Sequence, residues 1–289
     1  HSGDSISIYP PQNVPQHIID KIVDVTYRIA LELKVIGMIN IQFIEFRDEL
    51  YIIEVNPRSS RTVPYITKVT NVPVIDIATN IMLGKTLKEM GYSTGIAPQT
   101  NTVAIKVPVF STEKLPQVEV SLGPEMRSTG EVLGVGQNFH EAMYKGFTAA
   151  GTTIPKAGST ILVTVREMDK ENFLPIAKKF HELGCKFIAT AGTAKLLEDN
   201  DIPVQVAKKI SEGVPNILDV IRSGMIDLII DIPKKGNDIH SDGFKIRRTA
   251  IECDVSIMTS LDTVKALVDV MEHRYTPDTV EVISLSDIK

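Results

Sequence analysis

The chain of 289 residues is poor in cysteine and has no tryptophan. Its two cysteines, Cys185 and Cys253, lie far apart, and no cysteine or histidine accompanies them at the spacing of a zinc site. We therefore expect no disulfide framework and two reduced, buried thiols, as in a cytoplasmic protein. No apolar run approaches the roughly 20 residues that cross a bilayer, and no signal peptide is visible, so no membrane association is expected.

Positive charge is also scarce, with 31 lysines and arginines against 36 aspartates and glutamates, a net charge of −5. This balance argues against a surface that binds nucleic acid. The length suggests two domains, and a hydrophobic content of 43% is ample for two ordinary cores. The sequence begins at His1 without a methionine, which leads us to expect that it is part of a longer chain.

The most informative segment is a predicted β-hairpin between residues 40 and 58. Two apolar runs, 40–46 and 50–56, flank Arg47-Asp48-Glu49. Runs rich in Ile, Phe, Tyr and Val on either side of a short polar break are typical of two strands and a hairpin loop. We expect a loop of three residues centred on Asp48.

That register would gather polar side chains on one face of the hairpin. Gln42 would lie opposite Glu54, and Asn40 opposite Asn56, with facing Cβ atoms about 4.5–5.5 Å apart. Oxygen ligands of this kind suit Mg²⁺, which proteins usually hold with one or two carboxylates together with substrate phosphates. The hairpin therefore predicts a metal and phosphate site, although a lone glutamate in a strand is more often only solvated.

Two arginines follow the hairpin. Arg58 and Arg61 come directly after the predicted metal-binding strand, where guanidinium groups are suited to hold phosphate. Their position strengthens the case for phosphoryl transfer.

The segments around the hairpin give the organisation of the first half. We expect an amphipathic helix after Pro15 that is closed by Gly37, and a loop containing Pro57 and Pro64. The other expected elements are a helix at 75–83, a strand at 103–110, a glycine-rich turn segment at 123–134 and a helix near 139–149. The best domain boundary is the Gly- and Pro-containing stretch 150–158, which divides the chain into domains 1–150 and 151–289.

The second half alternates between strands and helices, which predicts a doubly wound parallel sheet of five strands. The expected strands are 161–165, 187–189, 204–206, 226–230 and 255–258, and the expected helices are 171–183, 193–199, 216–223, 247–253 and 261–272.

Polar residues follow several of these strands. In open α/β sheets, ligands bind outside the carboxyl ends of the strands. Lys170 follows the first strand, Thr190-Ala-Gly-Thr193 the second, and Lys208 and Lys209 the third. Each alone is more often structural, but together they predict a site for a phosphate-bearing ligand. No general base or nucleophile accompanies them, which indicates binding rather than catalysis.

Four motifs resemble the large-chain family of carbamoyl phosphate synthetases. They are His1-Ser-Gly-Asp-Ser, Gly37-Met-Ile-Asn-Ile-Gln42-Phe, Glu54-Val-Asn-Pro-Arg58-x-x-Arg61-Thr-Val-Pro and Leu122-Gly-Pro-Glu-Met-Arg-Ser-Thr-Gly-Glu-Val. The resemblance covers essentially the whole chain. It implies the C-terminal portion of an ATP-grasp unit that phosphorylates carbamate, followed by a regulatory domain of methylglyoxal-synthase-like (MGS-like) fold.

The resemblance also implies roles for individual residues. Gln42, Glu54 and Asn56 would bind the divalent metal, Mg²⁺ or Mn²⁺, that bridges the ATP phosphates. Arg58 and Arg61 would contact the transferred phosphoryl group. The N-terminal residues His1 and Ser2 would lie near the nucleotide and a potassium ion, and the effector site would contain Thr164, Lys170, Thr190, Thr193 and Lys209.

The implied partners are ATP, carbamate, the rest of the large chain and a small chain that supplies ammonia from glutamine, in an oligomer of that heterodimer. The effector would be a nucleotide of the UMP, IMP or phosphoribosyl pyrophosphate type. Alternatives are another ATP-grasp ligase, such as a carboxylase or a purine-pathway synthetase, and a free-standing regulatory nucleotide module.

The sequence departs from the family pattern in two places. Asp231-Ile-Pro replaces an Asn-Thr-Thr run, and a carboxylate there would repel phosphate or accept hydrogen bonds from a base or ribose. Relatives activated by ornithine have a Glu and a Tyr where this chain has Ile105 and Ile257, although Asp4 is retained. We therefore expect no activation by ornithine.

Overall fold

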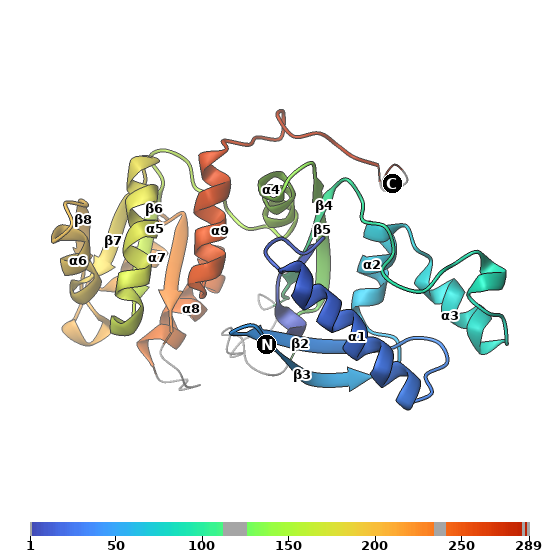
Figure 1. The fold of residues 1–289 in the computed structure, drawn as a ribbon. Helices are drawn as coiled ribbons and strands as arrows, with labels where there is room; N and C mark the ends of the chain where they lie inside the picture. The colour runs from blue at the N-terminus through green and yellow to red at the C-terminus, as the bar shows by residue number, and fades with distance from the viewer. Residues whose placement is uncertain (1, 112–125, 234–240, 285–286, 288–289) are drawn as a thin grey trace. The chain divides into compact units, whose positions relative to one another are not determined.

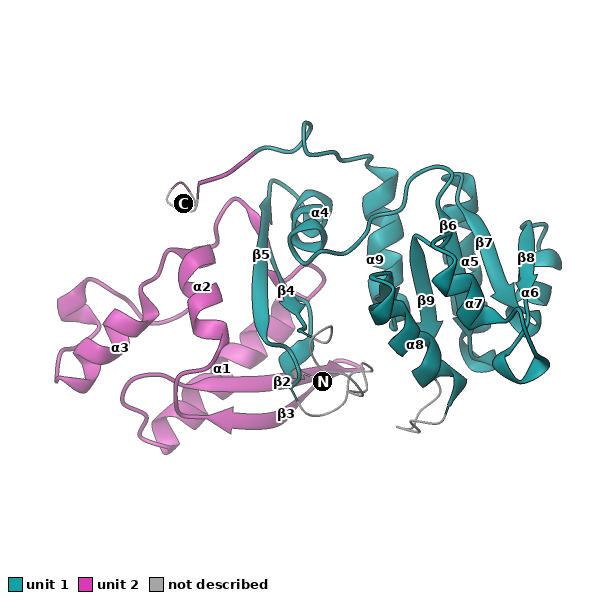
Figure 2. Cartoon of the chain, turned by 180° about the vertical axis from the view of Figure 1, so that it is seen from behind, with its two compact units in different colours: residues 1–7, 105–281 teal, residues 8–104, 282–289 magenta. Residues whose placement is uncertain are grey.

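A computed structural model describes residues 2–111, 126–233, 241–284 and 287. The chain forms two compact units, one made of residues 1–7 and 105–281 and the other of residues 8–104 and 282–289 (Figure 2). None of the described helices is long and apolar enough to cross a membrane.

The unit of residues 8–104 is built around one long helix and an antiparallel hairpin (Figure 1). Its elements are α1 (Gln16–Glu32), β2 (Asn40–Phe46), β3 (Glu49–Asn56), α2 (Thr62–Thr70) and α3 (Val74–Met82). The predicted helices α1 and α3 are confirmed. Gly84, which follows α3, has the positive φ angle that lets a chain turn after a helix. Helix α1 is not closed by Gly37 as expected: it ends at Glu32, and Lys34 has the left-handed conformation (φ 50°) just after it.

Helix α2 corrects the expectation of a loop around Pro64. Proline is compatible with the first turn of a helix, where its missing N–H would have no partner within the helix. Pro64 is the third residue of α2, so it does not interrupt the helix. The helix ends at Asn71, which adopts a left-handed conformation (φ 54°).

Strand β5 (Gly130–Gly136) corrects a second expectation, because the sequence predicts only a glycine-rich turn there. It completes a three-stranded sheet in the order β1 (Ser7–Tyr9), β4 (Val103–Val109), β5, and it packs against α4 (Phe139–Ala149). A Cβ atom at Gly134 would lie 2.1 Å from the carbonyl oxygen of Ala142. The glycine therefore allows the helix to lie directly on the strand.

The predicted doubly wound sheet is confirmed (Figure 1). It contains β6 (Thr160–Val165), β7 (Lys186–Thr190), β8 (Val204–Ala207), β9 (Leu228–Ile232) and β10 (Ser256–Met258). All pairings are parallel, in the order β10-β9-β6-β7-β8. The connecting helices are α5 (Lys170–Glu182), α6 (Ala191–Glu198), α7 (Ile217–Arg222), α8 (Asp242–Glu252) and α9 (Leu261–Glu272). Helix α8 begins five residues earlier than expected, at a Ser241 N-cap whose hydroxyl accepts from Phe244 N.

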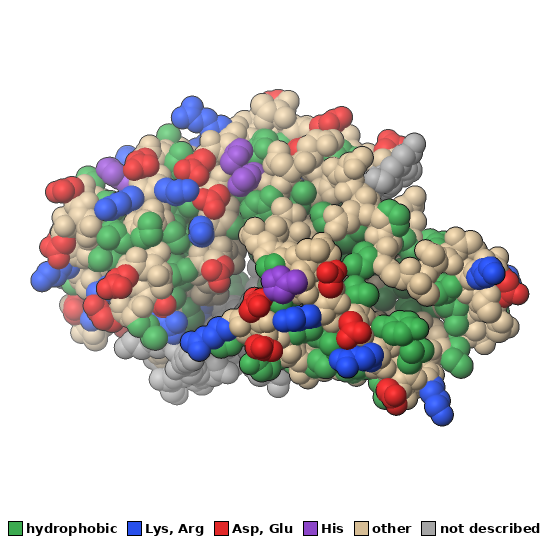
Figure 3. Space-filling model, viewed as in Figure 1, with side chains coloured by type: hydrophobic (Ala, Val, Ile, Leu, Met, Phe, Trp, Pro, Cys, Tyr) green, Lys and Arg blue, Asp and Glu red, His purple; other side chains and the backbone are tan. Residues whose placement is uncertain are grey.

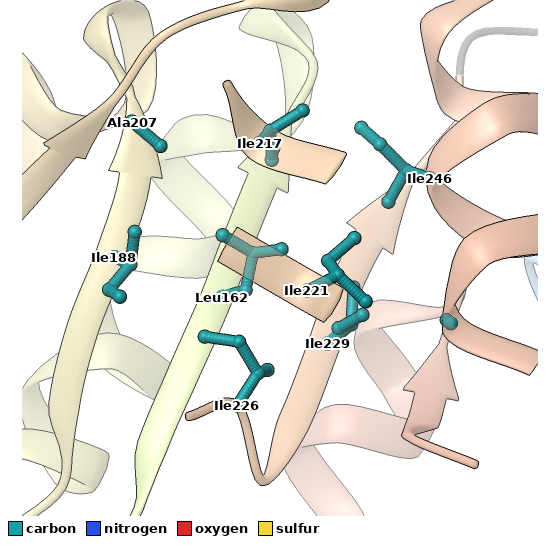
Figure 4. Close-up of a cluster of buried hydrophobic side chains, with 9 residues drawn as sticks. Leu162, Ile188, Ala207, Ile217, Ile221, Ile226, Ile229 and Ile246 are labelled. Carbon is teal, nitrogen blue, oxygen red and sulfur yellow. The ribbon is translucent and has the colours of Figure 1, made fainter. Parts of the chain in front are cut away.

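A buried cluster of aliphatic side chains packs against this sheet (Figure 4). Side chains from β6, β7 and β9 meet those of α7 and α8, and Leu162, Ile229 and Ile221 are fully buried among them. All five residues of β9 are buried because helices cover both faces of the sheet. This apolar core holds the carboxyl ends of β6 and β9 in fixed positions, where a ligand site is expected.

The hairpin unit is far less buried. Ile18 is the only buried residue of α1, and large apolar side chains of the hairpin are about half exposed, with Phe46 at 54% and Ile53 at 54%. Figure 3 shows hydrophobic side chains at the surface over α1 and the hairpin. Exposed apolar surface of this extent is typical of a face that another segment or protein covers.

Candidate functional site

The hairpin has the predicted strand register at its polar end, but its loop is shorter than predicted and β3 contains a bulge. Asn40 pairs with Asn56 and Gln42 with Glu54, as expected. The loop, however, contains two residues rather than three, because Phe46 pairs with Glu49. An irregularity beside Gln42 leaves Ile53 as an extra residue in β3, and this bulge restores the register. The loop length was therefore wrong, and the facing pairs are confirmed.

Contacts from α1 hold the tight turn. Arg47 and Asp48 both have positive φ angles, as a two-residue hairpin turn requires. The carboxylate of Asp48 contacts His17 Nε2, and its carbonyl oxygen accepts from Lys21 Nζ at 3.1 Å. The hydrogen bond from His17 lowers the pKa of Asp48. The Glu45 carboxylate also accepts from Asp48 N at 2.9 Å. Together these contacts stabilise a left-handed backbone conformation that residues other than glycine rarely adopt.

At the other end of β3, three polar side chains are joined by hydrogen bonds. Asn56 Nδ2 donates to Glu54 Oε1 at 3.0 Å, and Arg58 NH2 lies 3.4 Å from Asn56 Oδ1. Arg58 NH1 also donates to the carbonyl oxygen of Ser59 at 3.0 Å. The carboxylate, the carboxamide and the guanidinium therefore follow one another on the strand and just after it, with Gln42 on the facing strand.

This donor set fits a hard divalent cation. Carboxylate and carboxamide oxygens are ligands for Mg²⁺, and one carboxylate is enough where substrate phosphates complete the coordination. Within the described part of the chain, no group of three or more His, Cys, Asp or Glu residues could hold a metal alone. A metal at Gln42, Glu54 and Asn56 would thus depend on further oxygen ligands from a nucleotide.

Of the other residues predicted for this site, the structure describes Arg61 and Ser2 but not His1. Arg61 is the N-cap residue of α2. Ser2 begins the short 3-10 helix Ser2–Asp4, and His1 lies outside the described residues. Residues 122–125 of the last motif also lie outside them.

The second site is a cavity of about 660 Å³ at the carboxyl ends of β6 and β9. Chain order reverses between these two strands, which is where ligands bind in doubly wound sheets. All five predicted effector residues line it, namely Thr164, Lys170, Thr190, Thr193 and Lys209. Lys208 is not among the lining residues.

One end of the cavity has the character of an anion site. Lys170 Nζ lies close to Gly192 at the start of α6, 3.7 Å from where a Cβ would stand, and it also pairs with the exposed Glu167 at 2.6 Å. The Thr193 hydroxyl accepts from Val165 N at 3.3 Å, so this residue also ties α6 to the end of β6. A backbone turn at a helix start with a lysine beside it suits phosphate.

The opposite wall of the cavity contains a buried ion pair that the sequence analysis missed. Arg247 NH1 lies 2.7 Å from Asp231 Oδ2, and both side chains are only 4% exposed. A Cβ at Gly243 would stand 2.9 Å from Arg247 NH1, so the glycine leaves room for the guanidinium. Asp231 is thus neutralised by a cation, which removes the expected repulsion of phosphate. The available signal was an arginine on the apolar face of α8, between Ile246 and Ala250.

The cysteines agree with the expectation of free thiols. The two form no disulfide bond with each other. Cys185 is buried and Cys253 is partly buried. Burial raises the pKa of Cys185 to about 11, so its thiol is protonated and unreactive at neutral pH.

Comparisons with known proteins match both halves of the chain. A family model described as carbamoyl-phosphate synthase L chain, ATP binding domain, matches residues 1–90. A second model, described as MGS-like domain, matches residues 172–259. Among solved structures, the biotin carboxylase domain of a single-chain bacterial carboxylase covers 50% of this chain and 39% of its own at 17% identity. Its TM-score of 0.39 is too low to carry an argument.

The curated relatives agree with the two family models. Carbamoyl phosphate synthase large chains of Clostridium botulinum (strain Kyoto / Type A2) and Clostridium perfringens (strain 13 / Type A) are each 54% identical to this chain over 99% of its length. The chain spans 27% of the length of each of these relatives. Over nearly its whole length the chain is therefore similar to carbamoyl phosphate synthase large chains, and it matches the model of their ATP-binding domain and the MGS-like model in that order.

Proposed function

We propose that this chain works within a longer large chain that transfers phosphate from ATP to carbamate and so forms carbamoyl phosphate. The observation that carries the proposal is the pairing of Gln42 with Glu54 at the end of the hairpin, directly before Arg58. Residues 1–150 would be the closing portion of the ATP-grasp unit, and residues 151–289 a regulatory domain. The two family models match residues 1–90 and 172–259, one range on each side of residue 150.

In this mechanism the hairpin is the wall that faces the ATP phosphates. Glu54, Asn56 and Gln42 would hold Mg²⁺ or Mn²⁺, which would neutralise charge on the phosphates. Arg58 would stabilise the negative charge that builds up on the transferred phosphoryl group, and Arg61 would bind the carbamate or its product. A carbamate oxygen forms the new bond to the γ-phosphorus while the bond to the β-phosphate oxygen breaks, and ADP leaves.

The proposed partners follow from the family. They are the rest of the large chain, a small chain that supplies ammonia from glutamine, and a potassium ion near His1 and Ser2. The exposed apolar side chains of α1 and the hairpin support a further segment covering this unit. We therefore expect the chain of 289 residues to make no carbamoyl phosphate alone, and ATP-dependent product from the purified chain would contradict this.

We further propose that the cavity at β6 and β9 binds a regulatory nucleotide through its phosphate. Calorimetric titration of the 289-residue chain with UMP, IMP and phosphoribosyl pyrophosphate should detect binding of at least one. Lys209→Ala should remove it below detection, because hydrogen bonds to charged groups contribute about 1.5–3 kcal/mol each.

The neighbouring lysine provides a matched control for that titration. Lys208→Ala removes the same charge from the adjacent position, but Lys208 does not line the cavity, so affinity should stay within about threefold. If Lys209→Ala binds as tightly as the unchanged chain, the assignment of the second site is wrong.

We also predict that ornithine does not raise the turnover of the full-length enzyme. A separate cavity of about 340 Å³ is lined by Asp4 and Ile257, but Ile105 is fully buried and contributes no acceptor. A ligand with two ammonium groups would meet Asp4 and Asp254 there, but not the glutamate and the tyrosine of the relatives that ornithine activates, so its loss of hydration would be less well compensated. Steady-state rates with and without saturating ornithine test this, and an increase with ornithine would refute it.

A further inference from the structure

The most deeply buried carboxylate near the N-terminus connects two distant parts of the sequence. Asp4 ends the 3-10 helix Ser2–Asp4 and is only 2% exposed. Its Oδ2 accepts from Arg127 N at 2.8 Å, and its Oδ1 accepts from Ser128 N at 2.9 Å. One carboxylate thereby binds two consecutive backbone N–H groups more than 120 residues away in sequence.

A second contact fastens the same two segments. A Cβ atom at Gly3 would lie 2.5 Å from Met126 Cε and 3.1 Å from Met126 Cβ, so the backbone of Gly3 lies closely against the Met126 side chain. The close approach and the two hydrogen bonds involve adjacent residues on each side. They therefore fix both the distance between the segments and their register.

The charge of Asp4 strengthens this attachment. Burial opposes ionisation, but the N–H groups of Arg127 and Ser128, with the positive charge of Lys106, outweigh it and lower the pKa of Asp4. Lys106 is itself buried and pairs with Glu131 of β5 at 3.1 Å. Asp4 is thus ionised at neutral pH, and hydrogen bonds to an ionised acceptor are about twice as strong as neutral ones.

We propose that Asp4 is a positioning residue, which holds the turn carrying Ser2 against the backbone that leads into β5. The inference rests on the proposed function, in which Ser2 lies near the nucleotide. The family resemblance suggested Asp4 as a retained ornithine-site residue, whereas here both its oxygens hold the protein's own backbone. Loss of the carboxylate releases the turn and weakens ATP binding more than it slows the chemical step.

Two measurements test the proposal separately. In the 289-residue chain, Asp4→Ala should increase hydrogen exchange at the amides of Arg127 and Ser128. In the full-length large chain with its small chain, Asp4→Ala should raise KM for ATP about tenfold with a smaller change in kcat, the loss expected for one or two charged hydrogen bonds. Asp4→Asn keeps one acceptor oxygen and should give an intermediate KM, which guards against a folding failure of the alanine variant.

An exposed carboxylate of the same kind serves as the control. Glu89 accepts from Thr86 N at 2.8 Å within its own turn, so Glu89→Gln should change neither readout. Unchanged exchange in Asp4→Ala would refute the attachment, and faster exchange with an unchanged KM would refute the positioning role. If the unchanged full-length enzyme formed no carbamoyl phosphate, the proposed function would fail instead, and the exchange result would still decide whether Asp4 fastens the two segments.

Discussion

Glu54→Gln in the full-length large chain should lower the rate of carbamoyl phosphate formation by about 100- to 1,000-fold, the usual range for losing one preorganised electrostatic contact. Glu54 is the only carboxylate of the predicted metal set, and an amide of the same shape removes its charge while leaving the hairpin intact. The steady-state rate should recover in part as the Mg²⁺ or Mn²⁺ concentration is raised, because the variant weakens metal binding.

The same strand contains the control. Glu49 is an exposed carboxylate at the opposite end of β3, where it pairs with Phe46 beside the turn. Glu49→Gln makes the same chemical change at the far end of the hairpin from the predicted metal ligands and should leave the rate within about twofold, as surface substitutions usually do. A normal rate for the Glu54→Gln enzyme at every metal concentration would show that the hairpin does not bind the catalytic metal.

The hairpin illustrates what periodicity can and cannot predict. Alternation of side chains identified the polar face, and the facing pairs of Gln42 and Asn40 were correct. The two-residue turn could not be predicted, because the positive φ angles of Arg47 and Asp48 depend on α1, whose residues His17 and Lys21 contact the turn. The bulge at Ile53 then offset the error in loop length.

The missed elements have a common cause. Pro64 and the glycines of β5 have low propensity for regular structure, and what allows them differs: position within the helix for Pro64, and packing against another element for Gly134. Pro64 lies in the first turn of α2, and Gly134 lies beneath the backbone of α4. Propensity is a weak guide to β5 because tertiary packing decides its conformation.

The cavity was predicted more fully than the hairpin because parallel strands impose its geometry. Once the sheet was inferred, strand ends such as Thr164 and Thr190 had to meet at one edge. Arg247 was missed because it lies within a helix, and the expected start of α8 was five residues too late. Only the complete helix places its guanidinium against Asp231.

Arg247→Met should lower the free energy of unfolding of the MGS-like part by about 3–5 kcal/mol, the usual cost of removing one member of a buried ion pair. The substitution keeps much of the side-chain volume but removes the guanidinium that neutralises Asp231, whose carboxylate is 4% exposed. Urea unfolding followed by far-UV circular dichroism measures the change. Binding of any effector found by calorimetry should weaken as well, because an uncompensated negative charge would then face its phosphate.

The next residue on the helix is a close control. Arg248 pairs with Glu252 at 2.8 Å, but that glutamate is 50% exposed, so Arg248→Met should cost about 0.5 kcal/mol or less. In the double variant Asp231→Asn with Arg247→Met, the buried charge is gone from both sides, and much of the loss should be recovered. A double variant no more stable than Arg247→Met alone would show that packing of the Arg247 side chain, and not neutralisation of Asp231, is what stabilises this wall of the cavity.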